Sequence, residues 1–268
     1  MGRRRGFTLI ELLVVISIIS ILMAVLMPAL QRVKDQGRMT TCRSNLRNYA
    51  LIGRMYSDDN DYEFPYSFGW LYYRDEKTGV GEGTGCTWHN KSKNLDLHPE
   101  LAGVMWPYLK GQKINLCPTF AVIAKSMSCY MCKGATIPVD PQYGYTMNSY
   151  LHGDAWTSVP SQYHTKIKEM KTEAQVAQPA RTFYFGEENS WVIPGINGAG
   201  INDNNLRSTP NGTTDSFATF HKPPSGDLNN GVSFAAFVDG HVEFVTPYPK
   251  GSTFILSWPG DKPGPTGF

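Results

Sequence analysis

The five cysteines are the residues of this sequence whose chemistry depends most on spacing. Cys129 and Cys132 have two residues between them, which is the spacing of a zinc-binding pair, and Cys117 or Cys86 could supply further ligands. In an exported domain the same thiols form disulfides instead, with one thiol left over. We expect disulfides, and Cys42 with Cys117 is a candidate pair, although connectivity cannot be read from a sequence.

Glu11 is chemically unusual because it lies inside an apolar run from Phe7 to Leu30. A helix of about 20 apolar residues spans the hydrocarbon core of a membrane, where a carboxylate costs about 2–3 kcal/mol and usually marks a function. Among packed helices, Glu11 needs a cation as its partner. In an ordinary membrane anchor it would lie at the headgroup level instead. A cleaved secretory signal has a shorter apolar core and a small-residue exit, which residues 27–31 lack.

The other candidate metal ligands have simpler explanations. His221, Asp239 and His241 could form a site, but Asp239-Gly240 is typical of a hairpin turn and His241 of an exposed strand residue. The acidic residues 58–61 lack the glycine and the distal glutamate of a calcium loop. No common nucleophile, zinc-protease or phosphate-loop motif occurs. We therefore expect no enzyme and no cofactor, while calcium remains open without named ligands.

One long helix must position the amino-terminal residues. Pro28 lacks an amide donor and is expected to kink the helix, and residues 57–61 with Pro65 should end it. Its first half is hydrophobic all round, whereas its second half is amphipathic, so it should pass from lipid to a globular domain. The residues expected on its buried face are Cys42, Leu46, Tyr49, Gly53 and Tyr56.

Short strands are expected after the helix, first at residues 181–186. The clearest hairpin joins residues 233–238 to 241–245 through Asp239-Gly240. With a two-residue turn, Phe237 faces Val242. Four side chains should then pack on the long helix: Ala235, Phe237, Val242 and Phe244.

Aromatic residues are frequent in the middle of the chain. They could form a sugar-stacking surface, but packing against the long helix is the simpler interpretation. The residues concerned are Trp70, Tyr72, Tyr73, Trp88 and Trp106. Glycines at 79, 81, 83 and 85 indicate a loop, and the net charge of +2 gives no sign of nucleic-acid binding.

The segment Gly6–Leu12 resembles the processing site of type IV pilins and type II secretion pseudopilins. The resemblance implies that a prepilin peptidase cuts after Gly6 and methylates the new amino terminus at Phe7. It also implies that Glu11 pairs with that amino group, on the same or a neighbouring subunit, and so sets the axial register. Pro28 stands where this family has its kinking proline.

Later blocks resemble a large pseudopilin-like family that ends in an H-X9-DG region. In this chain 17 residues separate His221 from Asp239, where the family has nine, and we interpret the segment with Pro223 and Pro224 as an inserted loop. A contact between His221 and the hairpin therefore stays open. The blocks are 42–46, 55–60 with Pro65, 106–109, 117–118, 143–148 and 179–182.

These features predict a leader at 1–6, a transmembrane and assembly helix at 7–30, its amphipathic continuation at 31–57, a globular domain at 58–258 and a flexible tail at 259–268. The expected fold is α+β and pilin-like, with the long helix on an antiparallel sheet and long loops.

The expected function is that of a structural subunit of a membrane-anchored helical fibre, for type II protein secretion. The implied partners are the prepilin peptidase, other pilin or pseudopilin subunits, an inner-membrane platform and the lipid bilayer. Basic residues flank the apolar run on both sides, so charge alone does not orient it. The resemblance implies a cytoplasmic amino terminus and a periplasmic or extracellular domain. The alternative is a glycan-binding protein displayed on the same anchor.

Overall fold

The computed structural model describes residues 7–78, 80–81, 86–127, 129, 141–153, 170–196, 198, 200, 203–210, 215–248 and 252–260. Its α-helices are α1 (Leu9–Asp59), α2 (Trp106–Leu109), α3 (Pro118–Ile123) and α4 (Ser252–Ser257). Its strands are β1 (Tyr145–Asn148), β2 (Phe183–Glu187), β3 (Asn205–Leu206), β4 (Ser233–Phe237) and β5 (Val242–Val245). Short 3-10 turns are η1 (Lys91–Lys93), η2 (Pro99–Leu101), η3 (Ala124–Ser126), η7 (Glu173–Gln175), η8 (Pro179–Arg181) and η9 (Pro224–Gly226).

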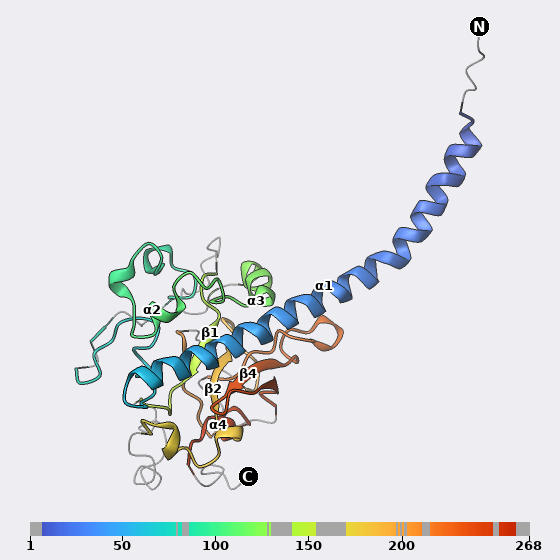
Figure 1. Cartoon of the computed structure of the whole chain (residues 1–268). Coiled ribbons are helices and arrows are strands. Elements are labelled where there is room, and N and C mark those ends of the chain that lie inside the picture. Colours follow the sequence, from blue (N-terminus) through green and yellow to red (C-terminus); the bar gives the residue numbers. More distant parts are fainter. Residues whose placement is uncertain are drawn as a thin grey trace.

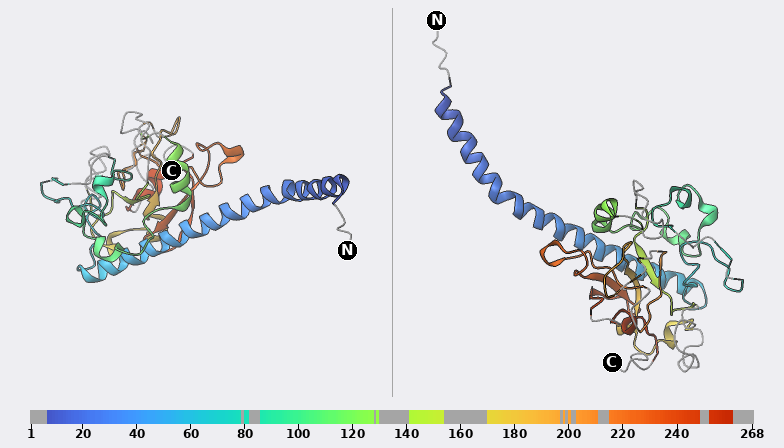
Figure 2. Two further views of the ribbon diagram at one scale, coloured as in Figure 1. Left: turned by 90° about the horizontal axis from the view of Figure 1, so that it is seen from above. Right: turned by 180° about the vertical axis from the view of Figure 1, so that it is seen from behind.

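Helix α1 is one continuous element of 51 residues, as the sequence predicts. Thr8 caps its start, and Asn60 caps its end within the turn-forming run. The helix continues through Pro28. Its first half projects away from the rest of the molecule as a curved rod, and its second half lies along one face of the domain (Figures 1 and 2).

The five strands form one sheet in the order β3-β1-β2-β4-β5. The pairs β1–β2, β2–β4 and β4–β5 are antiparallel, whereas β3 is parallel to β1. The fold is therefore α+β, with a long helix packed on a mixed, mostly antiparallel sheet. The predicted strand at residues 181–186 exists as β2, but Arg181 belongs to the preceding 3-10 turn.

One face of the sheet packs on the second half of α1. The predicted buried face of the helix is confirmed: Cys42, Leu46, Tyr49 and Gly53 are buried and Tyr56 is half-buried. Close packing explains the glycine, since a Cβ at Gly53 would lie 2.5 Å from the ring of Tyr184 on β2. The ring of Tyr49 also contacts Phe185, at 5.3 Å between centroids.

The other face of the sheet has a core of its own. Its buried residues are Phe183, Leu206, Phe217, Ala235, Phe237 and Val245, and Leu256 of α4 packs on them. Four of the five strands, β5 being the exception, are buried along their whole length because they are covered on both sides. A run that is buried on both faces shows no alternation, so the sequence could not assign its sides.

The predicted hairpin exists, but its predicted register is wrong. Ala236 pairs with Val242, and Phe237 donates its backbone N–H to the carbonyl of His241 at 2.9 Å. The loop therefore has three residues and ends at Gly240, whose φ is +90°. A one-residue shift between two strands turns the side chains of one strand over relative to those of its partner. Ala235 and Phe237 therefore lie in the second core, away from α1, whereas Val242 is in the core that contains α1, as predicted. Phe244 is 42% exposed and stacks on Phe234.

The aromatic residues of the middle segment are mostly core residues, as the packing interpretation predicts. Trp70, Tyr72, Trp88 and Trp106 are each at most 4% exposed, and only Tyr73 faces solvent. Trp70 packs edge-on against Tyr49 of α1. Four of the five rings therefore cannot stack on a sugar. The loop glycines 79, 83 and 85 and residues 261–268 of the expected tail lie outside the described residues.

Candidate functional site

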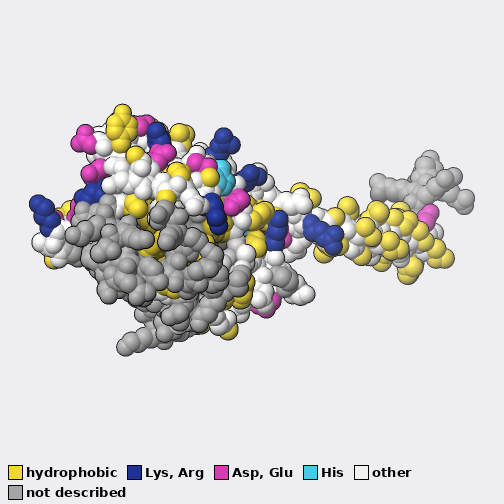
Figure 3. Space-filling view, turned by 90° about the horizontal axis from the view of Figure 1, so that it is seen from below, with side chains coloured by type: hydrophobic (Ala, Val, Ile, Leu, Met, Phe, Trp, Pro, Cys, Tyr) yellow, Lys and Arg dark blue, Asp and Glu magenta, His cyan; other side chains and the backbone are white. Residues whose placement is uncertain are grey.

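The projecting half of α1 exposes a continuous apolar surface. Every residue from Phe7 to Gly37 is solvent-exposed, and Phe7 itself is 72% exposed. Figure 3 shows hydrophobic side chains covering this rod, and Lys and Arg side chains where it meets the domain. This helix is long and apolar enough to cross a membrane, and none of its most apolar window is buried by the rest of the chain. Soluble proteins rarely expose so large an apolar surface, so it needs lipid or other helices as a cover.

Glu11 begins this rod as part of a capping box. Its carboxylate accepts hydrogen bonds from the backbone N–H and the hydroxyl of Thr8, both at 2.8 Å. The hydroxyl of Thr8 in turn accepts from the backbone N–H of Glu11 at 3.2 Å. The reciprocal bonds satisfy two orphan amide donors at the helix start. Glu11 therefore has polar partners within its own chain, beside Phe7. Gly6 lies outside the described residues.

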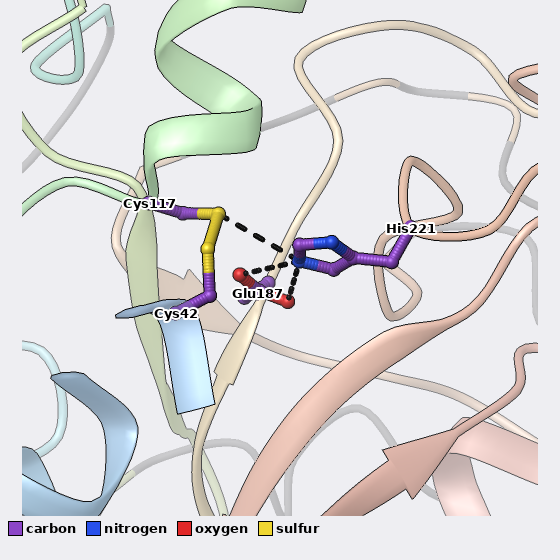
Figure 4. Close-up of side chains that lie close together, drawn as sticks. All are labelled: Cys42, Cys117, Glu187 and His221. Carbon is purple, nitrogen blue, oxygen red and sulfur yellow. Dashed lines mark hydrogen bonds and ion pairs between the residues drawn. A yellow bond between two sulfur atoms is a disulfide. The ribbon is translucent and has the colours of Figure 1, made fainter. Parts of the chain in front are cut away.

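A disulfide fixes the second half of α1 to the domain. Cys42 of α1 and Cys117, the residue before α3, form a disulfide with their Cα atoms 5.1 Å apart. Figure 4 shows this bond beside Glu187 and His221. The bond closes a chain segment of 75 residues, which in the loop-entropy model stabilises the fold by about 4 kcal/mol.

Glu187 and His221 form an ion-pair geometry in the core. Both side chains are fully buried, and Nε2 of His221 lies 3.0 and 3.1 Å from the two carboxylate oxygens of Glu187. The backbone N–H of Phe234 donates to the same carboxylate at 2.9 Å. Nδ1 of His221 has no hydrogen-bond partner among the residues that the structure describes. The pair thus joins β2 to the segment that precedes β4.

Cys42, Cys117, Glu187 and His221 lie close enough together to suggest a metal site. The sulfurs of the two cysteines are bonded to each other, so the group holds the fold together and is not a metal centre. His221 pairs with Val232 across the inserted loop, and its ring lies 5.1 Å from that of Phe234. The contact with the hairpin that the spacing left open therefore exists.

The structure does not bring His221 together with Asp239 and His241. Nδ1 of His241 is 2.6 Å from the carboxylate of Asp239, at the hairpin turn. The ring of His241 stacks on Phe237, with 4.4 Å between centroids. Asp239 and Gly240 therefore serve the turn, as the sequence predicts. Among the acidic residues at the end of α1, Asp58 pairs with Arg54 and Asp59 accepts from the hydroxyl of Tyr108.

A second sulfur cluster consists of Cys86, His89 and Cys129. One potential ligand atom from each lies within 4.8 Å of the others. The Sγ atoms of the two cysteines are 3.4 Å apart. Burial lowers the pKa of His89, which favours the neutral form of its ring. Cys132, the remaining candidate cysteine, lies outside the described residues.

Three carboxylates interact electrostatically: Glu188 and Asp215 are buried, and Asp203 is half-buried. Burial raises the pKa of Glu188 well above its usual range, and the charges of Asp215 and Asp203 raise it further. Burial likewise raises the pKa of Asp203 to about 6, although the guanidinium of Arg207 opposes the shift. Burial and then the charge of Asp203 raise the pKa of Asp215.

Sequence reasoning missed Glu187, His89 and these three acids. Glu187 follows an apolar run, and nothing in that run indicates a histidine partner far along the chain. For His89 a signal was present, since Cys86 and His89 have the same two-residue spacing as Cys129 and Cys132. The pattern of two such pairs is typical of zinc sites.

Comparison with known proteins finds similarity over part of the chain. Residues 1–27 match the family model described as the prokaryotic N-terminal methylation motif. The type IV wide pilus major component PilA4 of Thermus thermophilus is 43% identical over 61 residues. That match covers 23% of this chain and 47% of PilA4, so the chain spans about half the length of this relative. No solved structure matches significantly.

The matched residues 1–27 include the exposed apolar rod, Phe7 and Glu11. The methylation motif and the geometry of α1 thus agree on the same segment, and the resemblance noted in the sequence is confirmed. The chain carries the prokaryotic N-terminal methylation motif and is similar to a type IV pilin.

Proposed function

We propose that this protein is a structural, non-enzymatic subunit of a membrane-anchored helical fibre. The apolar rod of α1 carries the proposal, because such a surface must be covered by lipid before assembly and by neighbouring helices afterwards. Both environments are apolar, so a subunit can leave the bilayer for the fibre at little hydrophobic cost. The match of residues 1–27 to a methylation motif supports the same role.

Processing would create the partner that Glu11 needs. A prepilin peptidase cuts after Gly6, so that Phe7 becomes a methylated amino terminus with a positive charge. The Thr8 bonds satisfy Glu11 in a single chain. In a helical bundle the charged amine of Phe7, on the same or a neighbouring subunit, is the complementary partner in a water-poor environment. That pair would set the axial register between subunits.

The orientation and the secretion role are part of the proposal. The amino terminus lies in the cytoplasm and the domain lies outside the cytoplasmic membrane, where the Cys42–Cys117 disulfide is chemically stable. An inner-membrane platform and other pilin-like subunits are the assembly partners. We place the fibre in type II protein secretion. The glycan-binding alternative has less support, because four of its five candidate aromatic rings are buried.

Mass spectrometry of the native amino terminus tests the processing step. The expected product begins at Phe7 with one added methyl group, and a Gly6→Val variant should accumulate with its leader attached. Gly2→Val is the matched control, since it changes a leader glycine away from the cut. A native chain that retains Met1, or that begins near Gln31, would overturn the proposal.

A deletion strain separates the two fibre roles. Loss of protein export with surface pili intact supports the secretion assignment. Loss of pili with normal export would reject that assignment in favour of a pilus subunit.

A further inference from the structure

We propose that Cys86, His89 and Cys129 bind a zinc ion in the globular domain. Two cysteine sulfurs and one imidazole nitrogen form a ligand set that zinc favours. The three potential ligand atoms lie within 4.8 Å of one another, although they come from two segments that are far apart in the sequence. This inference goes beyond the proposed assembly function and is independent of the amino-terminal helix.

The first two ligands are held by one turn of backbone. The N–H of Asn90 donates to the carbonyl of Cys86 at 3.1 Å, which closes a helical turn. Residues three apart on such a turn lie on the same side, and this brings Cys86 and His89 together. Trp88 anchors this turn in the core, since it is 1% exposed and its ring packs on Phe120.

Neighbouring contacts make this turn rigid before any metal binds. The hydroxyl of Thr87 donates to the side chain of Asn204 at 2.8 Å, and the N–H of Gln142 donates to the carbonyl of Trp88 at 2.7 Å. A ligand pair on a fixed turn loses little conformational freedom on binding, which favours affinity. Cys86 is half-buried, so the site can be reached from solvent.

Cys129 supplies the third ligand, and its sulfur lies near the distance from Cys86 that a tetrahedral zinc site requires. Two thiolates that are each about 2.3 Å from a tetrahedral zinc ion lie about 3.8 Å apart. The observed Sγ–Sγ distance of Cys86 and Cys129 is 3.4 Å, so a shift of a few tenths of an ångström admits the ion. Disulfide formation between the same sulfurs is the competing chemistry in an oxidising compartment, and the test below distinguishes it from zinc binding.

Metal analysis of the full chain is the direct test. The chain is purified in detergent from membranes without chelators, and its zinc is measured by plasma mass spectrometry. We expect about one zinc ion per chain. Cys86→Ser, Cys129→Ser and His89→Gln should each lower zinc retention at least about tenfold against a competing chelator. His98→Gln changes an exposed histidine of the same segment and should retain the metal.

A variant that exchanges one ligand type for another keeps the proposal falsifiable if a loss variant fails to fold. His89→Cys replaces nitrogen with sulfur and should retain zinc. With cobalt(II) in place of zinc, it should show stronger thiolate-to-cobalt absorption than the wild type. Wild-type chain without bound metal, or peptide mapping that recovers a Cys86–Cys129 disulfide, would overturn the proposal. So would normal zinc retention in all three ligand variants.

Discussion

At the scale of single residues, the buried Glu187–His221 pair is costly to disturb. Each partner is fully buried, and each satisfies a polar group of the other. Removing one member of such a pair leaves a polar group buried and unpaired, which costs more than the pair contributes to stability. The pair therefore acts as a specificity device that holds the segment before β4 against β2.

The variant Glu187→Ala should lower the free energy of unfolding by about 3 kcal/mol, because His221 and the N–H of Phe234 lose their acceptor. Urea unfolding followed by tryptophan fluorescence measures the change. Glu243→Ala removes an exposed glutamate from β5 and should change stability by less than about 0.5 kcal/mol. Equal effects of the two substitutions would show that the Glu187–His221 pair does not hold these segments together.

The buried carboxylates give stability a pH dependence of definite sign. The pKa of Asp203 is raised to about 6, and those of Glu188 and Asp215 are also raised. In unfolded chains such groups lose their protons near pH 4. The native state then holds more protons than the unfolded state, so these groups lower stability progressively as the pH rises above about 4.

The variant Asp215→Asn removes one of these buried charges and should raise the urea midpoint at pH 7 relative to the wild type. The difference should shrink at pH 4, where the native carboxyl is protonated in the wild type as well. Asp96→Asn changes an exposed acid and should give the same small difference at both pH values. A benefit from Asp215→Asn that is larger at pH 4 would contradict the raised pKa.

At the scale of elements, the two halves of α1 are stabilised in different ways. Residues 7–37 of the projecting half are all solvent-exposed, so this half relies on the capping box and on helix propensity. The other half is held by the sheet, the Cys42–Cys117 bond and close packing at Gly53. A glycine occurs in each half, so the same glycine-to-alanine substitution can compare the two kinds of stabilisation.

We expect Gly53→Ala to destabilise the domain by about 1–3 kcal/mol, because the new methyl group overlaps the buried ring of Tyr184. Gly37→Ala is the matched control, since no atom lies within 4 Å of its added Cβ. It should strengthen the helix by about 0.5–1 kcal/mol through propensity alone. Thermal unfolding of both variants in the same detergent measures the contrast. Effects of the same sign would disprove close packing at Gly53.

At the scale of the whole molecule, the protein combines a solvent-exposed apolar rod and a domain with two cores (Figures 1 and 2). The rod carries the residues proposed for assembly, and the domain keeps it oriented through a disulfide and a packed helix face. Assembly and domain stability therefore depend on different residues and can be perturbed separately.

Replacing Glu11 with leucine separates insertion from assembly. Glu11→Leu should enter the membrane as well as the wild type, since the change only adds apolar surface. It should yield at least about tenfold less fibre, because the pair that sets the register is missing. Ile10→Leu is the neighbouring control. Membrane fractionation measures insertion and recovery of sheared fibres measures assembly. Normal fibres from Glu11→Leu would contradict the register argument.

The sequence by itself determined the features that arise from local physics. An apolar run with one acid predicted the exposed rod, a three-four spacing predicted the buried face of α1, and Asp239-Gly240 predicted a turn. Tertiary structure decided what depends on contacts between distant segments. It set the three-residue loop that reversed the faces of Ala235 and Phe237, and it paired Glu187 with His221. It also brought Cys129 close to Cys86 and His89. The sequence could not show this, because spacing along a chain does not specify which distant segments meet in the core.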